Sequence, residues 1–172
     1  MIKTRLAISL VALMGAAAGQ EPPGRDILIT LRSEPSLTLF AAAAPLGSMA
    51  KTLADGSPLT VFAFSERALS LLSREERETL MANRSAMQHL TSRYIVAGLV
   101  RKDDAAGLAA ARTLMGTRLR VDVRDEGVYV NGAIPQTDGI ECSNGVIYFV
   151  DRFDPVFVRD ALALAKSGLP TH

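Results

Sequence analysis

The chain has 172 residues, of which 48% are hydrophobic, and 19 Lys and Arg residues stand against 18 Asp and Glu residues. This length and hydrophobic content suit one domain with a sizeable core. The nearly balanced charge excludes a strong electrostatic field for nucleic acid or for an anionic membrane surface.

The first segment, residues 1–19, is predicted to be a secretory signal peptide. Lys3 and Arg5 precede a short apolar run that ends in small residues, which is the pattern of a cleavable signal. The apolar run is shorter than the roughly 20 residues that span a bilayer, and an anchored N-terminal helix is the alternative. Residues 20–25 are rich in Pro and Gly and predict a flexible lead-in.

The next part of the chain predicts helices followed by one buried strand. Asp26 is placed to cap a short helix over residues 27–31, and Ser36 to cap a second helix that Pro45 ends. A third apolar stripe over residues 46–53 predicts another helix. Residues 59–63 are apolar and rich in strand-forming types, so we expect a buried strand there.

Three further helices are expected after this strand. Ser65 is placed to open the first of them. Ser73 and Glu76 form a capping box, in which each side chain binds a free backbone N–H of the other residue. Residues 85–90 supply the third helical stretch.

The second half of the chain predicts strands and a terminal helix. Residues 118–124 alternate between apolar and charged types, which is typical of a half-exposed strand. Asn131-Gly132 is a hairpin signal. The apolar spacing over 155–166 predicts a final helix. The other expected strands are 94–96, 128–130, 137–142 and 146–150. Helices first and strands later predict an α+β domain.

Two segments resemble the two conserved boxes of the fasciclin domain family. The first is residues 59–69, and the second is residues 143–152. The chain is similar to a single-domain, secreted bacterial member of that family, with the domain over residues 26–154 and a C-terminal helix and tail over residues 155–172. The matching motif residues, which we interpret as mainly structural, are Val61, Phe62, Ala63, Asn144, Gly145, Val146, Ile147 and Asp151.

The resemblance implies a wedge-shaped β-sandwich with a helical N-terminal half and a short C-terminal helix. Three positions depart from the family pattern: Phe64 stands where Pro is usual, Arg93-Tyr94 where a Tyr-His pair is usual, and Tyr148 where His is frequent. The exchange of titratable groups for aromatic rings excludes a pH switch built on these positions. Phe64, Tyr94 and Tyr148 either pack in the core or form a patch for a ligand or partner.

The sequence offers no constellation for catalysis, and we expect no catalytic, cofactor-binding or metal-binding residues. His89 is the only internal histidine and is expected to serve packing or the surface. Cys142, the only cysteine, is expected to be a buried small residue, with an intermolecular disulfide or a reactive thiol as alternatives.

The resulting hypothesis is an exported, secreted or periplasmic adhesion module without enzymatic activity. It would bind a protein or polysaccharide of the cell surface or matrix but no nucleic acid, and it would keep no stable membrane span after signal cleavage. The alternative hypothesis is a soluble carrier of a small apolar, carotenoid-like ligand.

Overall fold

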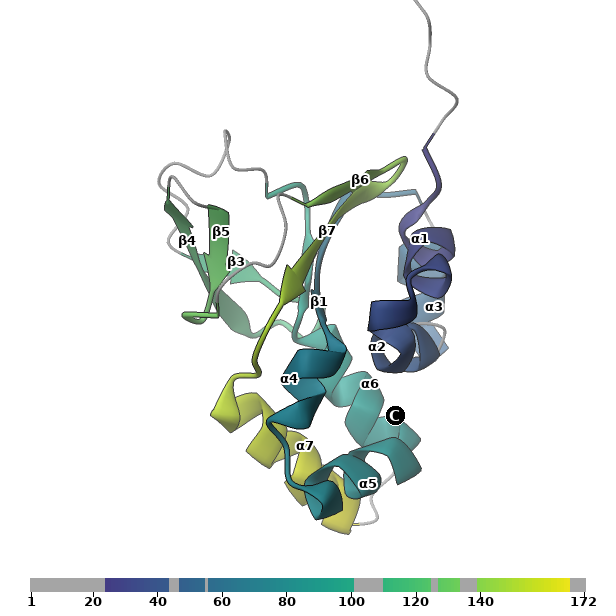
Figure 1. The fold of residues 1–172 in the computed structure, drawn as a ribbon. Helices are drawn as coiled ribbons and strands as arrows, with labels where there is room; N and C mark the ends of the chain where they lie inside the picture. The colour runs from purple at the N-terminus through teal and green to yellow at the C-terminus, as the bar shows by residue number, and fades with distance from the viewer. Residues whose placement is uncertain are drawn as a thin grey trace, which may run out of the picture.

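A computed structural model describes residues 24–43, 47–54, 56–100, 110–124, 127–133 and 139–167, and the structural statements below refer to these ranges. The predicted signal peptide and most of the predicted lead-in lie outside them, as does the predicted Pro45 stop. Figure 1 shows two sheets and two groups of helices.

The N-terminal helices are α1 (Ile27–Ser33), α2 (Thr38–Ala43) and α3 (Gly47–Ala54). The predicted Asp26 cap is confirmed, since the Asp26 side chain accepts from the Ile29 N–H at 2.7 Å. The predicted Ser36 cap is wrong, because Ser36 lies inside a 3-10 turn, η1 (Pro35–Leu37), that leads directly into α2.

The main sheet has four strands in the order β2-β1-β7-β6. The central strand β1 (Leu59–Phe64) pairs in parallel with β7 (Gly145–Val150) along its whole length. The strands β2 (Ile95–Ala97) and β6 (Ile140–Cys142) pair antiparallel to β1 and β7 and form the edges. All six residues of β1 are buried, which explains why its sequence is apolar without alternation.

The second sheet has three antiparallel strands, β3 (Ala110–Arg112), β4 (Arg118–Arg124) and β5 (Gly127–Val130). The predicted alternation in β4 is confirmed where it is described, because Leu119 and Val121 are buried while Arg118 and Arg120 are exposed. The turn after β5 is also confirmed, since both of its residues have the positive φ of a tight hairpin turn.

Four helices lie at the end of the main sheet where β1 and β7 terminate (Figure 1). They are α4 (Glu66–Ser70), α5 (Arg74–Ala82), α6 (Arg84–Ser92) and α7 (Pro155–Ser167). The predicted capping box is confirmed, with the Ser73 N–H donating to Glu76 at 2.8 Å and the Glu76 N–H donating to Ser73 at 3.2 Å. Ser65 precedes α4, but its side chain makes no capping bond there.

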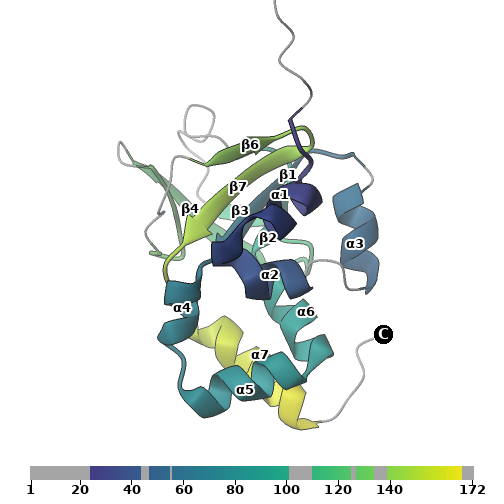
Figure 2. The same ribbon diagram turned by 45° about the vertical axis from the view of Figure 1, so that its right-hand side comes forward.

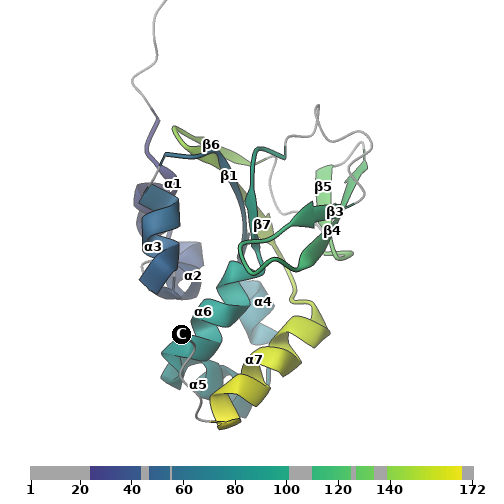
Figure 3. The ribbon, with the colours of Figure 1, turned by 180° about the vertical axis from the view of Figure 1, so that it is seen from behind.

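The views agree on the layers. The helices α1 to α3 lie on one side of the main sheet and the three-stranded sheet lies on the other (Figures 1 and 3). Figure 2 shows α1 and α2 in front of the main sheet, above the group formed by α4 to α7. A single buried cluster runs through all these layers and includes residues from α1, β1, α6, β7 and α7.

Candidate functional site

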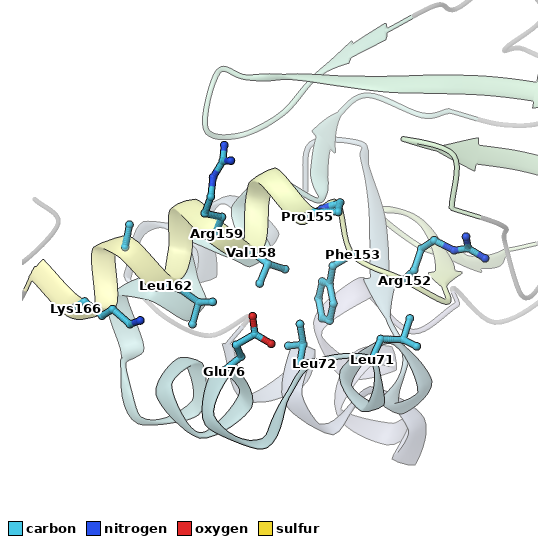
Figure 4. Close-up of a pocket in the computed structure, with 11 residues that line it drawn as sticks. Leu71, Leu72, Glu76, Arg152, Phe153, Pro155, Val158, Arg159, Leu162 and Lys166 are labelled. Carbon is cyan, nitrogen blue, oxygen red and sulfur yellow. The ribbon is translucent and has the colours of Figure 1, made fainter.

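An open, mostly apolar groove lies between the α4–α5 corner and α7 (Figure 4). It has a volume of about 650 Å³, which falls in the range of small-ligand pockets. Leu71 and Leu72 come from the corner that follows α4, and Leu71 keeps 65% of its surface exposed. The apolar residues that complete the groove are Phe153, Pro155, Val158, Leu162 and Ala163.

The groove exists because α7 is held at a fixed place by contacts on its inner side. Phe157 and Ala161 are buried there. Arg93, at the end of α6, forms an ion pair with Asp160 at 2.8 Å and lies 4.8 Å from the centre of the Phe157 ring. Pro155 occupies the first turn of α7, where its missing N–H is not needed. Val158 and Leu162, which belong to the predicted apolar spacing of this helix, line the groove, and Leu162 is turned toward it (Figure 4).

The rim of the groove carries three cationic side chains, from Arg152, Arg159 and Lys166, and one carboxylate, from Glu76. The hydrogen bonds between Glu76 and Ser73 lower the pKa of Glu76, and Lys166 lowers it further, so this carboxylate stays ionised. One of its oxygens is already bound to the Ser73 N–H. Arg152 lies beside Asp151, whose oxygens are 3.3 and 3.4 Å away. The positive charge on the rim thus favours the binding of an apolar ligand that carries negative charge at its edge.

The motif residues predicted from the sequence lie mainly in the two central strands. Val61, Phe62 and Ala63 in β1, and Val146 and Ile147 in β7, are buried and belong to the core. Asp151 follows β7 and is 7% exposed. None of these six residues lines the groove.

Asn144 and Gly145 connect the main sheet to the N-terminal helices. The Asn144 side chain accepts from the Ile27 N–H at 2.8 Å and donates to the Leu53 carbonyl at 2.8 Å. Gly145 lies so close to β1 that a Cβ atom there would fall 2.0 Å from the Leu59 carbonyl oxygen. These two residues therefore fix how α1, α3 and β1 meet at the start of β7.

The family model described as Fasciclin domain matches residues 35–153 of the chain, which is more than half of it. The chain belongs to the fasciclin domain family. Human periostin is 27% identical over 130 residues, covering 75% of this chain and 16% of periostin. The uncharacterized protein sll1735 of Synechocystis sp. is 25% identical over 120 residues, covering 70% of this chain and 90% of that protein.

Among solved structures, a FAS1 domain pair from the insect cell adhesion molecule Fasciclin I superposes with a TM-score of 0.64. The match has 15% sequence identity and covers 79% of this chain and 53% of the other. At this identity the likeness concerns the fold, and it confirms the predicted α+β fasciclin architecture. The chain thus shares its fold with an adhesion molecule, although it spans only 16% of periostin's length.

The three aromatic departures from the fasciclin pattern are all buried, with 1% of Phe64, 1% of Tyr94 and 3% of Tyr148 exposed. Phe64 and Tyr94 share a cluster with ring centres 6.0 Å apart. Tyr148 instead stacks on Phe62, and its hydroxyl donates to the Val100 carbonyl at 2.8 Å. The structure therefore places these residues in two parts of the core rather than on one exposed patch.

Tyr94 has a further structural role in this fasciclin domain. Its hydroxyl accepts from the Asp154 N–H at 2.8 Å, just before α7 begins. Burial raises the pKa of Tyr94 well above its ordinary value, which keeps the hydroxyl protonated. The ring that replaces the family's usual histidine thus anchors the start of the helix that forms one wall of the groove.

The remaining candidate residues are His89 and Cys142. His89 is half-buried on α6, and its pKa is lowered chiefly by burial and then by Arg93. Cys142, on the edge strand β6, packs against the core but is only half-buried, so the expectation of a buried residue is met only in part. Its sulfur lies 3.5 Å from the Thr30 hydroxyl, and burial raises the pKa of the thiol.

Within the described part of the chain, no three His, Cys, Asp or Glu side chains come together as metal ligands would. The helices of the described ranges are all too short or too polar to cross a membrane.

The groove itself was not predicted from the sequence. Its two walls, Leu71-Leu72 and α7, are more than eighty residues apart in the chain. The available signals were a Leu pair that follows a helix and a terminal helix with a wide apolar stripe. Neither pattern predicts that the two segments lie opposite each other in the fold.

Proposed function

We propose that this fasciclin domain is an exported adhesion module without enzymatic activity, which binds a protein or polysaccharide partner at the cell surface. The observation that carries the proposal is the open apolar groove between the α4–α5 corner and α7. Exposed apolar surface of this kind marks interaction sites on soluble proteins. The shared fold with an insect cell adhesion molecule supports the same role.

The groove fits an apolar segment of a partner protein that is flanked by carboxylates. Leu71 and Leu162 offer the apolar floor and wall, while Arg159 and Lys166 lie two helical turns apart on the rim. A segment laid along α7 would meet both cations in turn. Apolar grooves of this kind commonly bind an amphipathic helix, which lays its apolar face into the groove.

Retention on intact cells of the native host tests this function. Leu71→Glu places a charge on the floor of the groove, and we expect it to abolish retention. Met81→Glu is the matched control, because Met81 is 60% exposed on α5 and does not line the groove. A wild-type protein that is found only in the medium and binds neither cells nor surface polymers would overturn the proposal.

The second candidate function is a carrier of a small apolar ligand. The groove volume of about 650 Å³ favours it, since ligands of a few hundred daltons occupy pockets of this size. Native mass spectrometry of residues 20–172 isolated gently from the host separates the two functions. A reproducible extra mass of a few hundred daltons, lost in Leu71→Glu and kept in Met81→Glu, supports the carrier, whereas a bare chain or a partner protein's mass supports adhesion.

A further inference from the structure

Three arginines form a strip on the outer face of the three-stranded sheet. Arg112 on β3 lies directly opposite Arg118 on β4, and Arg120 follows two residues later on the same face. All three are exposed, whereas Ala111, Leu119 and Val121 between them are buried. Along a strand, alternate residues are about 7 Å apart, and directly opposed side chains start about 5 Å apart. Three guanidinium groups therefore share one small surface.

This arrangement costs stability. Like charges placed directly opposite each other on a sheet repel, and here the pair is Arg112 and Arg118. Among the described residues, neither side chain has an ion-pair or hydrogen-bond partner. A hollow of about 470 Å³ lies at this pair, lined also by Ala110, Ala111 and Gly116.

Among the described residues, acidic side chains share a hollow with the strip only at its Arg120 end. Arg120 shares a hollow with Asp122 and Asp154. The Asp154 carboxylate is already bound, because it accepts from the Asn131 side chain at 2.7 Å and from the Val156 N–H at 2.8 Å. Asp122 lies beyond Arg120 on β4 and does not line the hollow at Arg112 and Arg118. The positive charge is therefore concentrated at the β3–β4 pair.

We infer that this arginine strip binds an anionic polysaccharide that carries carboxylates along its chain. A guanidinium group binds a carboxylate through two parallel hydrogen bonds, which a lysine does not reproduce. Adjacent arginines on an open sheet face suit an extended polymer that presents its charges one after another. A strip of three cations in a nearly neutral chain is too small for nucleic acid, whose binding typically neutralises several phosphates.

This inference rests on the proposed adhesion function but uses a different surface from the groove. The residues of the strip and of the groove do not overlap. The three-stranded sheet also lies away from α4 and α5 (Figures 1 and 3). The polysaccharide and the protein partner can therefore be tested separately.

The experiment measures binding of the full mature chain to polygalacturonate at low salt, with neutral dextran as the blank. The triple variant Arg112→Gln, Arg118→Gln, Arg120→Gln should bind at least about tenfold more weakly, since each lost charge-assisted contact has a large effect on affinity. The charge-matched control carries Arg32→Gln, Arg67→Gln and Arg84→Gln, three exposed arginines on α1, α4 and α6. The control should stay within about twofold of the wild type.

Further arms identify the ligand and check the fold. If the chain binds dextran sulfate but not polygalacturonate, the assignment of a carboxylate-bearing ligand is wrong. If both triple variants lose affinity equally, the arginine strip is not the binding site. Equal affinity for anionic vesicles or single-stranded DNA would overturn a polysaccharide partner. Arg112→Gln alone should raise the melting temperature because it relieves the repulsion with Arg118, and a lower melting temperature would show that the strip serves the fold. Leu71→Glu should leave binding to polygalacturonate unchanged. A loss of partner binding at the groove can therefore be distinguished from a loss of polymer binding at the strip.

Discussion

Replacing Asn144 by Ala should remove the link between the main sheet and two N-terminal helices. The side chain makes two hydrogen bonds of 2.8 Å, one from the Ile27 N–H and one to the Leu53 carbonyl, and both are partly buried. Leaving a buried partner unsatisfied costs about 1–3 kcal/mol for each bond. Because both sites are only partly buried, we expect Asn144→Ala to lower the free energy of unfolding by about 2–4 kcal/mol in total.

Urea denaturation of residues 20–172, followed by circular dichroism, measures this loss from the shift of the midpoint. Asn144→Asp is the informative companion variant. It keeps an acceptor for the Ile27 N–H at the start of α1, where negative charge is favourable, but it loses the donor to Leu53. Its second oxygen faces the Leu53 carbonyl oxygen, and these two acceptors repel. Asn144→Asp should therefore be clearly less stable than the wild type.

An Asn144→Ala variant that loses less than about 1 kcal/mol would refute the reasoning, because even one broken buried bond should cost that much. An Asp variant as stable as the wild type would refute the assignment of the donor nitrogen to the Leu53 carbonyl. Either result would mean that the contacts of the helices with the core, rather than this side chain, position α1 and α3.

The remaining predictions concern three other sites. Gly145→Ala should prevent folding or cost more than about 4 kcal/mol, because its Cβ would lie 2.0 Å from the Leu59 oxygen, and a soluble variant with wild-type melting would contradict this. Burial lowers the pKa of His89 in the folded chain below 6.5, so the unfolded chain takes up this proton at a higher pH than the folded chain does. The free energy of unfolding should therefore fall as the pH drops through 6.5 toward the folded pKa. This dependence should disappear in His89→Gln, as melting curves across pH would show. The Cys142 thiol should react with iodoacetamide more slowly in the native chain than in urea, because burial raises its pKa, and equal rates would argue against that burial.

Local signals in the sequence predicted local structure well. The capping box at Ser73 and Glu76 and the cap at Asp26 each depend on residues within three positions, and both are present. The strand at residues 59–63 was predicted because full burial on both faces requires an unbroken apolar run. In these cases the energetic reason for the structure lies within the segment itself.

The features that the sequence left unpredicted or open depend on distant partners. The strand β3 (Ala110–Arg112) contains no β-branched or aromatic residue, and it forms because β4 offers it a pairing edge. For Phe64, Tyr94 and Tyr148 the sequence left packing in the core and a patch for a ligand as alternatives, and the structure buries all three. The groove likewise depends on α7 packing beside α5, although more than seventy residues separate the two helices in the chain.

The parallel pairing of β1 with β7 also sets an order of events during synthesis. Leu59 and Gly145 are register partners that lie 86 residues apart in the chain. At translation rates of about 5–20 residues per second, β1 emerges about 4–17 seconds before the strand that completes the middle of the sheet. During that time its six residues, five of them apolar, have only the edge strand β2 to pair with, and long-range pairing of this kind forms slowly. The domain therefore commits to its native topology only when its last strand has been made, and a chain truncated before Gly145 should expose β1 and aggregate.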